Sequence, residues 1–67
     1  MNIKESNMEE KILEFLQQND NCVEETKLLI EFDYCFSEYA DALKKLIARG
    51  DVICEIEEDE FYMKSNL

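Results

Sequence analysis

The chain has 67 residues, of which 17 are acidic and 7 are basic, so its formal net charge is −10. A chain of this length forms one domain at most, with a small core and little net stability. Hydrophobic residues make up 46% of the sequence, which is enough for such a core and argues against intrinsic disorder. A protein this acidic repels phosphate backbones unless its few cations gather on one face. The simplest alternative explanation of the charge is solubility alone.

No apolar run is long enough to cross a bilayer, and the start, Met-Asn-Ile-Lys-Glu-Ser-Asn, lacks the apolar core of a signal peptide. We therefore expect a soluble, cytoplasmic protein without membrane contact. The cysteines, Cys22, Cys35 and Cys54, form no Cys-x-x-Cys motif, and the chain has no histidine. Three cysteines cannot complete a disulfide framework, and a zinc site would need a carboxylate or a second chain. We expect mostly buried thiols in a reducing compartment, and neither metal nor cofactor.

The first predicted element is a helix that begins near Asn7 and follows a loose arm, residues 1–5. Ser6 and Glu9 have the spacing of a capping box, Ser-x-x-Glu, which is typical of a helix start. The turn formers at residues 19–21 should end this helix. Its apolar stripe consists of Met8, Ile12, Phe15 and Leu16.

A second, shorter helix is predicted over Cys22–Glu31, with Asn21 as its N-cap. Its hydrophobic phase is weak, and the position of Leu28 stays open. Its expected inward positions are Val23, Leu29 and Ile30. Residues 32–36, Phe-Asp-Tyr-Cys-Phe, fit a turn that places aromatic rings in the core. Within it, Phe36 should pack at the start of the next helix.

The strongest pattern predicts a helix over Ser37–Arg49, with Ser37 as its N-cap. Arg49 lies in the last turn, where a cation suits the helix dipole. Gly50 is the only glycine in the chain and stands where a left-handed residue commonly ends a helix. The apolar face of this helix consists of Ala40, Leu43, Leu46 and Ile47.

A β-hairpin is predicted after this helix. Alternation from Val52 to Glu57 indicates a half-buried strand, and residues 57–59 make the turn. The second strand covers Glu60–Lys64, with Tyr62 on the face opposite to Phe61 and Met63. The last residues, 65–67, should be loose. The predicted fold is therefore α+β, three helices followed by a hairpin (α-α-α-β-β), in one domain over residues 1–67 with an ordered core at about 6–64.

This order of elements resembles a winged helix-turn-helix domain. The segment Leu43–Val52 is similar to the end of the recognition helix and the start of the wing in families such as the MarR-like regulators. Those families carry a leucine, three mostly polar residues, a glycine, any residue and then an aliphatic. The resemblance covers about residues 6–64. It implies a first helix at Val23–Glu31, a turn at Phe32–Phe36, a recognition helix at Ser37–Arg49 and a wing at Ile53–Lys64.

The charges depart from the pattern of DNA-binding members, in which the recognition helix enters the major groove and the wing is usually basic. Here Glu38 and Asp41 lead the third helix, beside Ser37 and Lys45 as further exposed candidates. Acidic side chains facing phosphates at an interface are strongly unfavourable. The candidate partner-binding residues are therefore acidic: Glu38, Asp41, Glu55, Glu57, Glu58, Asp59 and Glu60.

Two functional hypotheses follow. The first is a non-enzymatic interaction module that binds a basic protein surface, with a nucleic-acid-mimicking regulator or inhibitor as a variant. The alternative is a DNA-binding transcriptional regulator, with Lys44, Lys45 and Arg49 as phosphate contacts. No constellation of catalytic residues is visible, so we do not expect an enzyme. The sequence leaves monomer and homodimer open, since exposed tyrosines could form a self-interface: Tyr34, Tyr39 and Tyr62.

Overall fold

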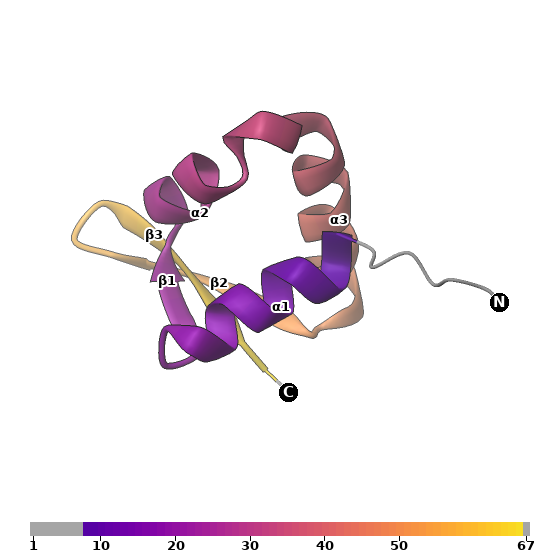
Figure 1. Cartoon of the computed structure of the whole chain (residues 1–67). Coiled ribbons are helices and arrows are strands. Elements are labelled where there is room, and N and C mark those ends of the chain that lie inside the picture. Colours follow the sequence, from indigo (N-terminus) through magenta and orange to yellow (C-terminus); the bar gives the residue numbers. More distant parts are fainter. Residues whose placement is uncertain (1–7, 67) are drawn as a thin grey trace, which may run out of the picture.

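The computed structural model describes residues 8–66 and has the α+β layout of a small winged helix (Figure 1). Its strands form one antiparallel sheet in the order β1-β3-β2, and the helices pack on one face of that sheet. The predicted fold class is thus confirmed, with an additional strand. The elements are α1 (Met8–Gln18), β1 (Cys22–Glu24), α2 (Glu25–Glu31), the short 3-10 helix η1 (Asp33–Cys35), α3 (Phe36–Arg49), β2 (Val52–Glu57) and β3 (Glu60–Ser65).

The core lies between the helices and the inner face of the sheet. An aromatic cluster connects α1 to α3. The ring of Phe32 stacks on Tyr39, with centroids 5.6 Å apart, and meets Phe15 edge-on at 5.9 Å. Burial of these apolar surfaces is the main stabilising contribution to a fold of this size. The buried residues are Ile12, Leu16, Val23, Leu28, Phe32, Tyr39, Ala42, Leu43, Leu46, Val52 and Met63.

The end of α3 is capped as the sequence predicts. Gly50 has a φ of +87°, which a residue with a side chain rarely adopts. Its amide donates to the carbonyl oxygen of Ile47 at 3.1 Å, and the amide of Asp51 donates to that of Leu46 at 3.0 Å. This pair of bonds is a Schellman motif. The side-chain amide of Asn66 donates to the Gly50 carbonyl oxygen at 3.0 Å, so the end of the chain is tied to this turn. The expectation of loose residues from 65 onward is wrong for the described ones.

The predicted start of the second helix is wrong, because residues 22–24 form strand β1. Val23 lies opposite Met63 in the register with β3. Asn21 has a positive φ and caps nothing, and the helix begins only at Glu25. Its phase also differs from the prediction. Leu28 is fully buried, whereas Ile30 is 74% exposed.

The third helix begins one residue earlier than predicted, at Phe36, and Ser37 is inside it. Its N-cap is Cys35, which makes no side-chain capping bond. Tyr39, expected at the surface, is buried, and Phe36 is half exposed. The aromatic residue that anchors α3 in the core is therefore Tyr39. The proposed capping box falls on Ser6, outside the described residues.

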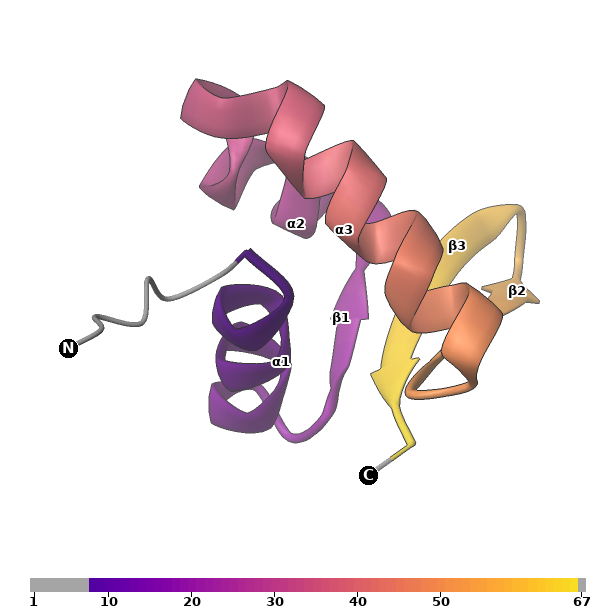
Figure 2. The same cartoon turned by 90° about the vertical axis from the view of Figure 1, so that its right-hand side faces the viewer.

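The hairpin has a two-residue turn, Glu58 and Asp59, between paired Glu57 and Glu60. Both turn residues have positive φ, +49° and +68°, as a type I′ turn requires. The turn projects beyond the helices (Figures 1 and 2). The predicted half-buried alternation of the first strand is therefore wrong beyond its start, because every residue of β2 after Val52 is exposed.

Candidate functional site

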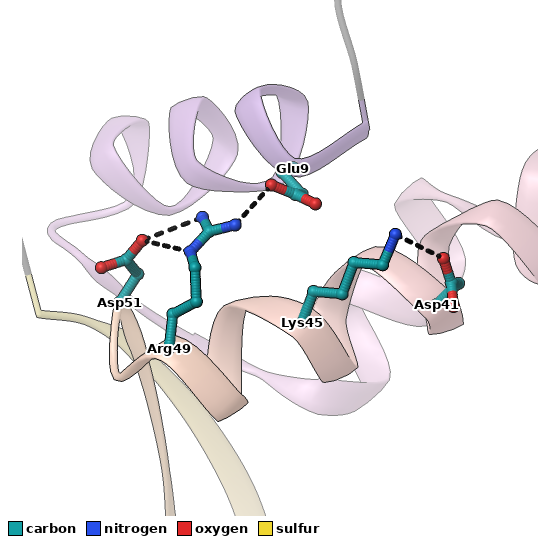
Figure 3. A network of polar contacts seen from close by, with 5 residues as sticks. All are labelled: Glu9, Asp41, Lys45, Arg49 and Asp51. Atoms are coloured by element: carbon teal, nitrogen blue, oxygen red, sulfur yellow. Dashed lines mark hydrogen bonds and ion pairs between the residues drawn. The ribbon is translucent and has the colours of Figure 1, made fainter.

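The acidic residues of α3 lie on its solvent-facing side. Glu38 and Asp41 are both exposed, one turn apart in the N-terminal half of the helix. The Lys45 ammonium nitrogen lies 3.3 Å from Oδ2 of Asp41, in an i,i+4 ion pair whose side chains are both more than half exposed (Figure 3). Such a pair contributes little to stability. It does, however, place the positive charge of Lys45 beside the negative charge of Asp41, so that the two partly cancel.

Arg49 contacts two carboxylates at the end of α3 (Figure 3). Its Nη1 donates to Oε1 of Glu9 in the first turn of α1 at 2.8 Å. Its Nε and Nη2 both donate to Oδ2 of Asp51, at 3.1 and 2.9 Å. The hydrogen bonds that Arg49 donates to Glu9 and then to Asp51 raise the pKa of the guanidinium further above its already high value. Arg49 thus joins α1, α3 and the start of β2.

The three cations proposed for phosphate contact are therefore not a free basic face. Arg49 is held by Glu9 and Asp51, and Lys45 by Asp41. Within residues 8–66, Lys44 is the only one of the three without an ion pair.

The acidic residues of the hairpin lie on the outer face of the sheet and at its turn. Glu55, Glu57 and Glu60 are on the face of the sheet turned away from the helices. Side chains alternate between the two faces along each strand, and in this register these three lie on the face opposite to the buried Met63. Lys64 lies on the same outer face, and its Nζ is 2.7 Å from Oε1 of Glu55. This ion pair raises the pKa of Lys64, the hydrogen bond to Glu55 being the main cause.

Glu24 of β1 joins this outer face, since it pairs with Tyr62 in the register. Its carboxyl group hydrogen-bonds that of Glu60, and the adjacent charge adds to the effect, so the pKa of Glu60 is raised. Two acidic groups in contact compete for ionisation in this way. Sequence analysis missed Glu24 because residues 22–24 were assigned to a helix. In the structure, Val23 is buried between two less buried neighbours. An alternation of only three residues is too short to indicate a strand in the sequence.

The predicted acidic site is thus two surfaces rather than one. Figures 1 and 2 place the hairpin turn well away from the N-terminal half of α3. Glu38 and Asp41 belong to that helix. We use the name acidic hairpin surface for the second group, which consists of Glu24, Glu55, Glu57, Glu58, Asp59 and Glu60.

A groove lies on the opposite side of the hairpin, between α2, α3 and β3. Its volume is about 370 Å³. Its walls are mostly apolar and include Leu29 from α2, Phe36 and Ile47 from α3, and Met63 from β3. Phe36 is 52% exposed and Ile47 is 40% exposed, so these side chains present apolar surface to solvent. Sequence analysis placed both in or near the core and did not predict a groove.

The described residues show no arrangement of metal ligands. Over residues 8–66, no group of three or more His, Cys, Asp or Glu side chains is placed to hold a metal ion. Cys22, Cys35 and Cys54 are free thiols. The expectation that they are mostly buried is wrong, because Cys22 and Cys35 are half-buried and Cys54 is exposed. In the same part of the chain, none of the helices combines the length and the apolar character that a membrane crossing needs.

Comparison with protein-family models, with curated proteins and with solved structures gave no match to this chain.

Proposed function

We propose that the chain is a non-enzymatic, winged-helix protein-interaction module of the cytoplasm that binds a basic surface of another protein. The observation that carries the proposal is the acidic hairpin surface. It projects beyond the helices, and within the described residues its one ion pair is that of Glu55 with Lys64. A variant of this function is a regulator or inhibitor that imitates nucleic acid and occupies a nucleic-acid-binding groove of its partner.

The contact residues would be Glu57, Glu58 and Asp59 at the turn, with Glu24 and Glu60 behind them. Closely spaced carboxylates attract a positively charged partner over a distance set by the ionic strength. Association with a basic partner also relieves the repulsion between Glu24 and Glu60, whose contact raises the pKa of Glu60. The acidic pair on α3, Glu38 and Asp41, would be a secondary contact at most, because Lys45 offsets it.

The test uses a fluorescent lysine-rich peptide and measures its association rate constant at several salt concentrations. Replacing Glu57, Glu58 and Asp59 by serine should lower that rate constant by at least about tenfold at low salt, with little effect at high salt. The matched control removes the same charge elsewhere, in the variant Glu14→Ser, Glu31→Ser and Asp33→Ser. Equal rate constants for the two variants would contradict the assignment of the contact to the hairpin.

DNA binding remains the alternative hypothesis and needs its own test. A gel shift at low salt with a random-sequence duplex should show no complex. A complex that disappears steeply with added salt would favour the regulator instead.

A further inference from the structure

Exposed apolar side chains of the hairpin lie on the same face of the sheet as the groove. Met63 forms the floor of the groove at β3. Phe61 lies two residues before it, on the same face of the strand, and Ile56 lies opposite Phe61 on β2. Phe61 is 47% exposed and Ile56 is 65% exposed. Exposed apolar side chains gathered on one face of a small protein commonly mark a binding site.

The groove has the form that suits a helix. It lies between two helices, with Leu29 on one wall and Phe36 and Ile47 on the other. Phe36 and Ile47 stand about three helical turns apart, roughly 16 Å along the axis of α3. An amphipathic helix binds such a groove with apolar anchors spaced at successive turns.

The charge of the chain selects among the possible occupants. The net charge of −10 opposes a second copy, and the acidic hairpin surface is on the other face of the same hairpin as Ile56 and Phe61. A helix with one apolar face would place that face in the groove, and basic residues beside it would be attracted by Glu25 at the groove and by the net negative charge of the chain. We propose that the groove of α2, α3 and β3 binds an amphipathic, basic helix of another protein. This inference rests on the proposed function and adds the apolar anchor to it.

Tyr39 adds a polar feature to this groove, which it helps to line. Its hydroxyl group is buried and has no hydrogen-bond partner among residues 8–66. Burial, with the nearby carboxylate of Glu25, raises the pKa of Tyr39 to about 12, so the hydroxyl remains a donor. Buried donors without an acceptor are uncommon in folded proteins.

The probes are two synthetic peptides of identical composition, leucine and lysine only. One has the spacing of an amphipathic helix, and the other is scrambled so that no apolar face forms. Fluorescence anisotropy should show that the amphipathic peptide binds about tenfold more tightly than the scrambled one, because only it can place leucines in the groove. Equal affinities would overturn the inference and leave the proposed function standing. No binding of either peptide would overturn both.

Variants of the chain localise the contact. Ile47→Ser and Ile56→Ser should each remove most of the preference for the amphipathic peptide without changing the affinity for the scrambled one. Ile53→Ser is the matched control, because Ile53 is 41% exposed but lies on the outer face of β2. An equal loss in Ile53→Ser would overturn the assignment to the groove. Ile56 lies on the hairpin and not on α3. A loss of preference in Ile56→Ser therefore cannot come from a change in the stability of that helix.

The groove contains one cation, Lys44, at its rim. Lys44→Gln should tighten binding of the amphipathic peptide, since like charges repel at an interface. Weaker binding in this variant would contradict a basic occupant. Sedimentation of the chain alone provides the remaining test. A dimer that persists in Ile53→Ser and dissociates in Ile47→Ser would assign the groove to a second copy and overturn the proposal.

Discussion

Arg49 at the end of α3 donates to the carboxylate of Glu9 in the first turn of α1, with 2.8 Å between Nη1 and Oε1. This contact bridges 40 residues of sequence and, with Asp51, gives the guanidinium a structural role. The one arginine of the chain is thereby engaged in two ion pairs. The same contact makes a specific prediction about stability.

Arg49→Met should lower the stability of the fold, because it leaves Glu9 and Asp51 without their partner. The effect should be smaller than that of Leu46→Ala, which removes a fully buried side chain at roughly 2–5 kcal/mol. It should also shrink in high salt, since Arg49 is half exposed. Urea denaturation at two salt concentrations measures both effects. Lys44→Met is the control, and equal destabilisation by the two variants would show that the ion pairs of Arg49 contribute nothing specific.

Tyr39→Phe should leave the fold equally stable or stabilise it by up to about 1 kcal/mol. The hydroxyl group it removes is buried and finds no partner within the described part of the chain. Such a group has lost its hydrogen bonds to water without gaining one in the fold. Thermal and urea denaturation give the change in the free energy of unfolding. Tyr34→Phe, at a 75% exposed position, controls for loss of a hydroxyl as such. A loss of stability in Tyr39→Phe alone would mean that the hydroxyl is bonded in solution.

The contact of Glu60 with Glu24 predicts a dependence on pH. The pKa of Glu60 is raised in the folded chain above the ordinary 4.5. A carboxyl group whose pKa is higher in the folded chain stabilises the fold at any pH below its pKa in the unfolded chain. This contribution is lost as the pH rises through its pKa in the folded chain. The free energy of unfolding should therefore fall as the pH rises above about 4.5 and Glu60 ionises.

Glu60→Gln should flatten this part of the pH profile and be more stable than the wild type at neutral pH. Glu14→Gln removes one carboxylate from α1 and should keep the wild-type slope. Chemical denaturation at a series of pH values makes the comparison. If Glu60→Gln retains the full slope, the contact with Glu24 is not its origin.

The hairpin turn stores backbone strain that substitution can relieve. Glu58 and Asp59 both have positive φ, a conformation that asparagine and glycine adopt far more easily. The double variant Glu58→Asn and Asp59→Gly should stabilise the fold by about 1 kcal/mol. Part of any gain could come from removing two charges. Measurement in high salt, where that part is screened, separates the two causes, and a gain that vanishes there would contradict the strain.

The local signals of the sequence were sufficient for α1, for most of α3 and for the turn at Gly50. Each of these depends on residues within one or two turns of one another. Strand β1 was not predictable in this way, because Cys22–Glu24 is extended only through its pairing with β3. The same applies to the site. The acidic hairpin was visible in the sequence, whereas the contacts of Glu24 with Glu60 and of Arg49 with Glu9 depend on the folded chain.

Tyr39 illustrates a second reason for a wrong prediction. Tyrosine is found both at surfaces and in cores, and its hydroxyl suggested exposure here. Its ring instead stacks on Phe32 and lies beside Phe36, so aromatic packing decided its position. The groove depends on this outcome, because the burial of Tyr39 leaves Phe36 at the surface.

The central claim is that the acidic hairpin, and not the cations of α3, is the contact surface. Mapping of amide chemical shifts in the isotope-labelled chain at low salt tests it most directly, with a lysine-rich peptide and a random-sequence DNA duplex as ligands. The account predicts that the peptide shifts the amides of residues 55–60 and of Glu24, and that the duplex shifts none. Duplex-induced shifts at Lys44, Lys45 and Arg49, with an undisturbed hairpin in the peptide titration, would contradict it.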